Sequence, residues 1–287
     1  MVNGVSIVLV EQPRPGIACV TLNRPERMNS VAFDLMVPLK KTLEEISYDN
    51  AIRAVVLTGA GRGFSSGADH KSAGPIPRID GLTPPTMGLR SMELLDDVIL
   101  TLRKMHQPVI AAVNGAAIGG GMCLALATDI RVASSAAYFR AAGINNGLSA
   151  SELGLSYLLP KAVGTSRAFD IMLTGRDVHA DEAERIGLVS RQVPAEDLLA
   201  TCYDIAERIA AFSRPGVELT KRTLWSGMDA SSLEGHMQAE GLGQLYIRML
   251  TANFEEAVAA RAQRRDPVFI DDEPRSELPP PTPIHAR

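Results

Sequence analysis

The fold is predicted most directly by residues 107–129, QPVIAAVNGAAIGGGMCLALATD. The apolar run Val109 to Val113 is short and rich in β-branched residues, which indicates a buried strand. A turn is expected at Asn114-Gly115, and three glycines follow at positions 119–121. The segment Met122 to Ala127 is apolar without a breaker, which is typical of a buried helix. The glycines therefore mark the start of a helix that follows a strand.

These three glycines allow two interpretations. The first backbone N–H groups of a helix lack an intrahelical partner, and the helix dipole favours negative charge there. Because glycine lets a ligand approach the backbone closely, the cluster predicts an anion or oxyanion site. A tight turn under close packing would use the same residues, and one glycine cluster does not distinguish the two.

A second stretch of the same kind favours the oxyanion interpretation. Ala54 to Gly59 has the pattern of a buried strand, and it leads into the Gly/Ser-rich loop Ala60 to Asp69. The two stretches together resemble the crotonase (enoyl-CoA hydratase/isomerase) superfamily. Further matching motifs, in family order, are Leu22-Asn-Arg-Pro25, Phe64-Ser-Ser-Gly-Ala-Asp69, Pro108 to Gly115, Asp129-Ile130, Leu173-Thr-Gly175 and Ala183 to Val189. The resemblance covers roughly residues 5 to 270.

The resemblance implies an α/β fold of the crotonase-like (ClpP/crotonase) type, a spiral of ββα units followed by a helical C-terminal trimerisation region. We expect a spiral core with the CoA and acyl site over residues 1–200 and a helical oligomerisation region over 201–270. Residues 271–287 are rich in proline and polar residues, so we expect a disordered tail. The family assembles as trimers or dimers of trimers, which implies a homotrimer or homohexamer.

Composition excludes several other classes of protein. The chain has 287 residues, of which 46% are hydrophobic, enough for a sizeable core. Its net charge of −4 and the absence of a long basic run give no indication of nucleic-acid binding, and no apolar stretch is long enough for a membrane span. The cysteines Cys19, Cys123 and Cys202 have no paired spacing and lie in apolar contexts. Together with an N-terminus that lacks signal-peptide features, they predict a cytoplasmic protein without a disulfide framework or metal site.

The remaining hydrophobic pattern predicts further elements. Val5 to Val10 and Ile17 to Leu22 are expected to pair as a hairpin, and Ser30 to cap a helix of about 18 residues. Residues 70–88 are interpreted as a long, mobile rim of the acyl pocket, followed by an amphipathic helix over Leu89 to Met105. Later predictions are strands over Ile130–Ala133, Ala137–Phe139 and Leu188–Gln192, and helices over Thr165–Leu173, Asp181–Ile186, Leu198–Phe212, Pro215–Trp225, Leu233–Leu250 and Phe254–Ala262.

The family resemblance implies an oxyanion hole built from two backbone N–H groups. One belongs to the alanine of Gly-Ala-Asp, which is Ala68 here, and the other to the middle glycine, which is Gly120. A thioester oxygen between them would gain negative charge on enolisation. One such preorganised donor lowers a barrier by about 3–4 kcal/mol.

The same resemblance places the CoA moiety. The loop edge that receives adenine in the family corresponds to Ser66, Ala68 and Asp69. Arg24 and Arg27 follow the second strand, where the family holds the CoA nucleotide, and are candidate phosphate ligands. A solvated pair of surface arginines is the alternative. No cofactor beyond the CoA moiety of the substrate is implied.

Both acids of the family's hydratases are missing. One lies two residues after the triple glycine, where this chain has Cys123, and the other follows the second short strand, where it has Gly143. Adding water to a double bond needs one group to activate the water and one to protonate carbon. The ordinary hydratase mechanism is therefore in doubt.

One acid remains nearby, in the segment Ser151-Glu-Leu-Gly-Leu-Ser-Tyr-Leu-Leu-Pro160, which resembles the family's isomerase branch with one extra residue before Glu152. A carboxylate in such apolar surroundings has a raised pKa, which suits a base. Alternatively, Ser149 or Ser151 caps a short helix and Glu152 is merely its first-turn acid. We favour the base.

The sequence thus predicts an acyl-CoA enzyme that stabilises a thioester enolate, with double-bond isomerisation by Glu152 as the favoured reaction. The alternatives are an enoyl-CoA hydratase with a non-standard site and a catalytically weak CoA-thioester-binding protein. We interpret His70 as a loop histidine without a catalytic part and Cys123 as a core residue. Asn145 and Asn146 either contact substrate or form a turn.

Overall fold

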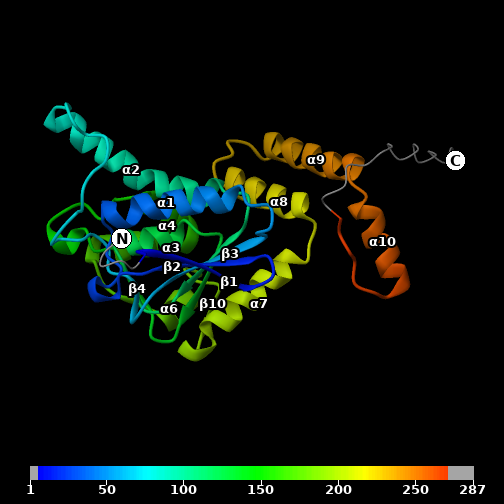
Figure 1. The fold of residues 1–287 in the computed structure, drawn as a ribbon, viewed down its shortest axis with the longest axis horizontal. Coiled ribbons are helices and arrows are strands. Elements are labelled where there is room, and N and C mark those ends of the chain that lie inside the picture. Colours follow the sequence, from blue (N-terminus) through cyan, green and yellow to red (C-terminus); the bar gives the residue numbers. More distant parts are fainter. Residues whose placement is uncertain (1–5, 271–287) are drawn as a thin grey trace. The chain divides into compact units, whose positions relative to one another are not determined.

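A computed structural model describes residues 6–270 of the chain, so the expected tail over 271–287 lies outside the described residues. The chain divides into two compact units between Glu207 and Arg208, whereas the sequence placed the boundary after residue 200. The first unit contains all the strands of the described chain, and the second contains only helices (Figure 1).

Two sheets form the first unit. The larger has the order β1-β2-β3-β5-β7-β10 and the smaller the order β4-β6-β8-β9. β1 pairs antiparallel with β2 and β9 antiparallel with β8, while all other pairs are parallel. The strands are β1 (Val8–Arg14), β2 (Ile17–Leu22), β3 (Ala54–Gly59), β4 (Gly63–Ser65), β5 (Val109–Val113), β6 (Ala116–Ile118), β7 (Ile130–Ser134), β8 (Tyr138–Arg140), β9 (Val178–His179) and β10 (Arg191–Val193).

Successive turns of the chain contribute one strand to each sheet. β3 leads into β4, β5 into β6, and β7 into β8, so the chain advances as a spiral of paired strands. The turns between the strands are tight. At Gly115, between β5 and β6, a Cβ would overlap the carbonyl oxygen of Arg62 in the preceding turn. This arrangement confirms the predicted spiral of ββα units.

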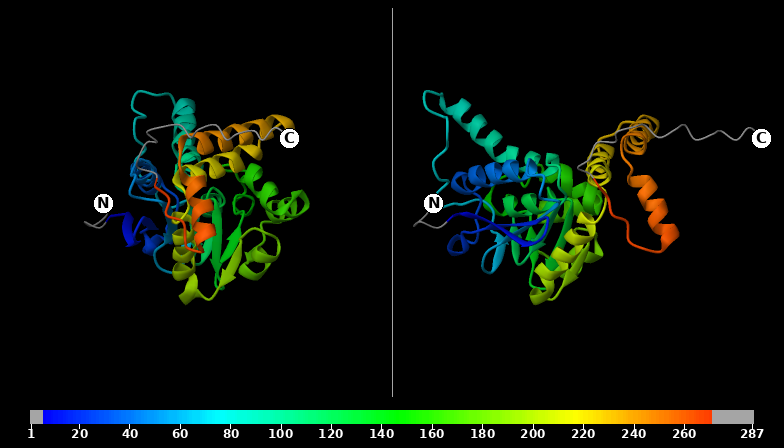
Figure 2. Two further views of the ribbon diagram at one scale, coloured as in Figure 1. Left: turned by 90° about the vertical axis from the view of Figure 1, so that its right-hand side faces the viewer. Right: turned by 45° about the vertical axis from the view of Figure 1, so that its right-hand side comes forward.

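Helices cover the sheets of the first unit (Figures 1 and 2). α3 is buried along its whole length, which places its N-terminus inside the fold next to β4 and β6. The helices of this unit are α1 (Phe33–Ser47), α2 (Pro84–Lys104), α3 (Gly120–Leu126), α4 (Leu155–Val163), α5 (Thr165–Thr174), α6 (Ala180–Arg185) and α7 (Leu198–Ala210), the last of which crosses the unit boundary.

Two expectations about helix starts are wrong. α2 begins at Pro84 rather than Leu89, since two prolines occupy its first turn, where a missing N–H costs nothing. The loop after His70 therefore ends at Thr83. Ser30 does not cap α1, whose N-cap is Ala32; the Ser30 hydroxyl instead donates to Asp69.

The second unit contains α8 (Arg214–Gly227), α9 (Leu233–Leu250) and α10 (Asn253–Gln263), drawn yellow to orange in Figure 2. Ser213 and Ser232 cap α8 and α9 by accepting hydrogen bonds from the N–H groups of Gly216 and Gly235. Within residues 6–270 no helix has the length and apolarity that a membrane crossing requires.

Candidate active site

The two predicted halves of the oxyanion hole lie side by side. Gly67 follows β4 and Gly119 follows β6, and a Cβ on Gly119 would lie 3.8 Å from the Cα of Gly67. A Cβ on Gly67 would lie 2.6 Å from the carbonyl oxygen of Ile118. Both glycines also have positive φ, 78° and 51°. Glycine is needed at position 67 because a Cβ would clash with the Ile118 carbonyl, and at position 119 because the positive φ strains any other residue.

The N–H group of Ala68 points away from the segment that holds this loop. Val31 donates its N–H to the Gly67 carbonyl at 2.7 Å and accepts from the Asp69 N–H at 2.9 Å. Because the N–H and C=O of a planar trans peptide point in opposite directions, the Ala68 N–H faces away from Val31. It has no hydrogen-bond acceptor among the described residues.

The N–H group of Gly120 is also available. Gly120 is the first residue of α3, and its N–H finds no acceptor within residues 6–270. A Cβ on Gly120 would lie 3.0 Å from Val31 Cγ2 and 3.4 Å from Leu153 Cδ1, so apolar side chains enclose this backbone. Sequence reasoning missed Val31, which belongs to no motif, and did not place Leu153 beside Gly120.

Glu152 reaches the same place from the segment before α4. Its Oε1 lies 3.0 Å from the point that a Cβ on Gly119 would occupy. Glu152 is not in a helix: α4 begins at Leu155 with Gly154 as N-cap, so the interpretation as a first-turn acid is wrong. Leu153 and Gly154 both have positive φ, 44° and 79°, and this turn aims the carboxylate toward the glycines.

Burial raises the pKa of the Glu152 carboxyl above its ordinary value. None of the described residues donates a hydrogen bond to this carboxylate, which leaves desolvation unopposed. Below it, the Cys123 thiol donates to the Glu152 carbonyl oxygen at 3.5 Å. Burial, followed by the charge of Glu152, raises the pKa of that thiol well above its ordinary value, so it stays protonated.

The two positions that carry acids in the family's hydratases, 123 and 143, differ in their surroundings. Cys123 is fully buried within α3. Gly143 precedes the short 3₁₀ turn Ile144–Asn146, and a Cβ there would overlap the carbonyl oxygen of Ser149 and lie 3.0 Å from Ala150 Cα. No side chain fits at position 143 unless the segment around Ser149 moves.

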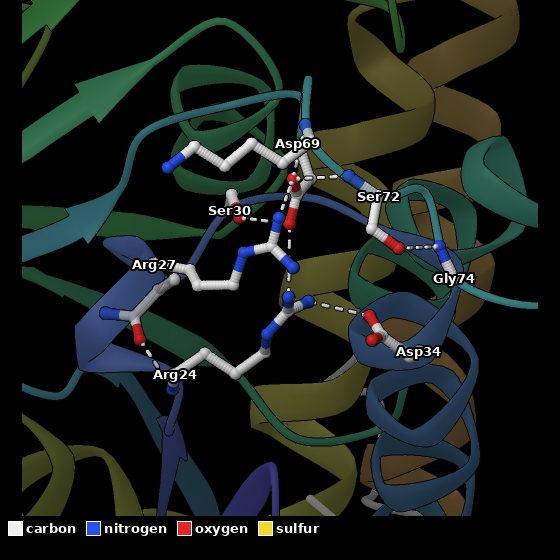
Figure 3. Close-up of polar contacts among 9 residues, drawn as sticks. Arg24, Arg27, Ser30, Asp34, Asp69, Ser72 and Gly74 are labelled. Carbon is white, nitrogen blue, oxygen red and sulfur yellow. Dashed lines mark hydrogen bonds and ion pairs between the residues drawn. The ribbon is translucent and has the colours of Figure 1, made fainter.

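The candidate CoA residues Arg24, Arg27 and Asp69 form an ion-pair cluster (Figure 3). The Arg24 guanidinium lies 2.6 Å from Asp34 Oδ1 and 3.1 Å from Asp69 Oδ2, and its side chain is only 4% exposed. Arg27 is 28% exposed and contacts Asp69 Oδ1 at 2.5 Å. These arginines are therefore not the solvated surface pair that was the alternative. Their roles toward CoA phosphate remain predictions.

Comparison with known proteins gives the family. The sequence pattern of enoyl-CoA hydratases/isomerases matches residues 12–272 of this chain. The chain belongs to the enoyl-CoA hydratase/isomerase family. A Mycobacterium bovis protein named "Probable enoyl-CoA hydratase echA12" is 79% identical over 268 residues, which cover 93% of this chain and 94% of the relative.

Solved structures of family members agree. A crystal structure of a probable enoyl-CoA hydratase/isomerase from Mycobacterium abscessus is 72% identical, with a TM-score of 0.90, and covers 94% of this chain and 100% of that chain. Another, of a monofunctional enoyl CoA isomerase from M. smegmatis, is 65% identical, with a TM-score of 0.70, and covers 82% of this chain and 99% of that chain. These likenesses confirm the crotonase-like fold. The names include both reactions of the family.

The remaining residues considered in the sequence analysis lie in loops or in the short 3₁₀ turn Ile144–Asn146. Ser66 donates its N–H to the Met28 carbonyl at 2.9 Å. His70 is exposed, in the loop after Asp69. Asn145 packs over Gly175, where a Cβ would lie 2.5 Å from Asn145 Oδ1, and Asn146 is exposed in the same turn.

Proposed function

We propose that this chain is an enoyl-CoA isomerase that moves the double bond of a 3-enoyl-CoA into conjugation with its thioester, with Glu152 as the base. The observation that carries the proposal is the place of Glu152, whose Oε1 lies 3.0 Å from the point that a Cβ on Gly119, the residue before Gly120, would occupy. The name of the M. smegmatis relative, a monofunctional enoyl CoA isomerase, supports the same reaction.

The proposed reaction needs one base and an oxyanion hole. The thioester oxygen accepts hydrogen bonds from the Ala68 and Gly120 N–H groups, which makes the C2 proton more acidic. Glu152 removes that proton, and the electron pair of the C2–H bond delocalises onto the thioester oxygen as a dienolate. Glu152 then returns the proton at C4, so the double bond moves from C3–C4 to C2–C3 and no atom is gained or lost.

The surroundings of Glu152 favour this chemistry over hydration. Burial raises the pKa of the Glu152 carboxyl, and a carboxylate of higher pKa is a stronger base. Hydration would require a second acid–base group, and positions 123 and 143 carry a buried thiol and a glycine without room for a side chain. The substrate is an acyl-CoA thioester, and in this proposal the main chain of the loop edge at Ser66, Ala68 and Asp69 receives its adenine.

Two parallel assays test the proposal on the purified chain, one with a 3-enoyl-CoA and one with a trans-2-enoyl-CoA, both followed by the absorbance of the conjugated thioester. We expect a rise with the first substrate and little change with the second. The variant Glu152→Gln should lower the first rate by about 10²–10⁴-fold while CoA binding persists, since a general base contributes that much.

The matched control is Glu45→Gln, which neutralises an exposed carboxylate on α1 that pairs with Lys41. It should isomerise like the wild type. Unchanged turnover in Glu152→Gln would remove Glu152 as the base. A fall in absorbance with the trans-2-enoyl-CoA would show hydration through other groups, and silence in both assays would favour a CoA-thioester-binding protein.

A further inference from the structure

The Asp69 carboxylate lies at the centre of a buried network in which every neighbour is a donor. Its Oδ2 accepts from Arg24 at 3.1 Å and from the Ser30 hydroxyl at 3.0 Å. Its Oδ1 accepts from Arg27 and from the backbone N–H groups of Lys71 and Ser72. Figure 3 shows the carboxylate between the two guanidinium groups and the turn at Ser72.

We propose that Asp69, with Arg24 as its buried counter-ion, is a positioning residue that fixes the direction of the Ala68 N–H. The inference rests on the proposed function to the extent that Ala68 holds a thioester oxygen. It assigns to the Asp69 side chain a task in orienting the oxyanion donor, rather than a contact with the CoA nucleotide.

The geometry supports this because the Asp69 carboxylate connects the two segments that orient the Ala68 N–H, residues 30–31 and residues 67–69. Val31 holds the peptides on both sides of Ala68 through Gly67 and Asp69. The Asp69 carboxylate in turn accepts from the hydroxyl of Ser30, the residue before Val31. This hydrogen bond ties the same two segments together a second time. If this tie is lost, the loop that carries the Ala68 N–H relies on its backbone hydrogen bonds to Val31 for its orientation.

The charges point the same way. The Asp69 side chain is 3% exposed, and five donors already occupy its two oxygens, so a nucleotide finds no free lone pair there. Burial alone would raise the pKa of this carboxyl, but the Ser72 and Lys71 N–H groups, the Ser30 hydroxyl and the charge of Arg27 lower it below its ordinary value. The group is therefore held ionised as the anchor of the cluster.

Neutralising Asp69 would also leave the guanidinium groups of Arg24 and Arg27 without the carboxylate that both contact, so their positive charges would repel each other. Of its two ion-pair partners within residues 6–270, Arg24 would keep Asp34, and Arg27 would lose the carboxylate it shares with Arg24. The start of α1 is linked to the same network, since Phe33 donates to the Ala73 carbonyl at 2.7 Å. We therefore expect Asp69→Asn to displace the Ala68 loop rather than only to weaken one contact.

A substrate without a nucleotide separates positioning from CoA binding. The 3-enoyl thioester of N-acetylcysteamine carries the thioester but no adenine or phosphate. A positioning residue predicts that Asp69→Asn lowers kcat about 10²-fold on this thioester and on the CoA thioester alike, because an error of about 1 Å at a reacting centre costs that much. A loss confined to KM of the CoA thioester would overturn the inference and return Asp69 to the nucleotide.

A spectroscopic readout makes the test independent of turnover. A conjugated dienoyl-CoA bound to Glu152→Gln should show a red-shifted absorption band, since hydrogen bonds to the thioester oxygen polarise the chromophore. Adding Asp69→Asn should reduce that shift while the ligand still binds. An undiminished shift would overturn the inference. If the wild-type chain does not isomerise 3-enoyl-CoA, the proposed function fails, yet the comparison of shifts still decides the role of Asp69.

Two further variants keep the test valid if Asp69→Asn does not fold. Ser30→Ala removes one donor and leaves the Arg24–Asp69 pair in place, and it should lower kcat on both thioesters by several-fold with a smaller red shift. The matched control is Glu182→Gln, which breaks the pair with Arg176 elsewhere in the same unit and should change neither quantity. Wild-type kcat and red shift in Ser30→Ala would contradict the proposed tie.

Discussion

At the scale of single residues, Glu152 combines burial with the absence of a hydrogen-bonding partner among residues 6–270. The folded protein therefore favours the neutral carboxyl, whereas a base must be ionised. We predict that kcat/KM for a 3-enoyl-CoA rises with pH through an apparent pKa above that of an ordinary glutamate and then levels off. A profile of kcat/KM against pH measures this rise. A profile that is flat through this range would contradict the assignment.

The same raised pKa makes Glu152 a source of instability above that pKa. A folded state that favours the protonated form loses stability as pH rises from the unfolded pKa through the folded pKa. Glu152→Gln removes the ionised form, so the variant should melt at a higher temperature than the wild type near pH 7. The difference should vanish at acid pH, where both side chains are neutral. Calorimetric scans at the two pH values check this, and a lower Tm for the variant near pH 7 would be the opposite result.

Sequence reasoning predicted roles for Glu152, Ala68 and Gly120 because each belongs to a motif that resembles the family. It did not show that Arg24 is enclosed by Asp34 and Asp69, since the partner Asp69 comes from a different loop. Ion pairs between separate loops leave no periodic signal in a sequence. The same holds for Val31, whose side chain lies beside Gly120 although the two residues are far apart in the sequence.

At the scale of secondary-structure elements, the short strands of the smaller sheet depend on turns that exclude a side chain. We predict that Gly115→Ala destabilises the protein by about 1–3 kcal/mol, because the added methyl group overlaps the Arg62 carbonyl and overpacking costs this much. Denaturant titration of the variant measures the change.

The matched control is Gly88→Ala within α2, where an added Cβ meets nothing within 4 Å. In a helix interior alanine is favoured over glycine by about 0.5–1 kcal/mol, so this variant should be slightly more stable than the wild type. Equal effects of the two substitutions would mean that the β5–β6 turn is not the constraint described.

The elements that the sequence missed are those with the weakest local signal. β4 and β6 have three residues each, too few to show alternation, and their strand character comes from pairing with each other and with β8. The long strands β3 and β5 have the predicted bounds because their apolar runs are continuous. The early start of α2 was missed because a Pro-Pro pair also suits a loop.

At the scale of the whole molecule, the second unit exposes apolar side chains that a solvated helix does not need. On α9, Leu242 is 69% exposed and Leu245 is 56% exposed. We predict that the chain forms a homotrimer or homohexamer that covers this helix, as the family resemblance implies. Light scattering of the purified protein should give the mass of three or six chains.

A double variant, Leu242→Glu with Leu245→Glu, should reduce that mass, because burying two new carboxylates in an apolar interface is costly. The control Lys41→Gln changes an exposed residue on α1 and should leave the mass unchanged. A monomeric wild type, or an unchanged assembly in the double variant, would exclude α9 as the contact.

The two proposed oxyanion donors follow β4 and β6, which are neighbouring parallel strands, and both are main-chain groups. Neighbouring strands lie about 4.8 Å apart, so the sheet itself sets the distance between the turns that carry the donors. Because the donors are main-chain groups, replacing the side chain at Ala68 or Gly120 with any residue except proline leaves the N–H group itself present. Substitutions during evolution can therefore replace the carboxylates of such a scaffold and change its reaction. The main-chain groups that bind an enolate are retained.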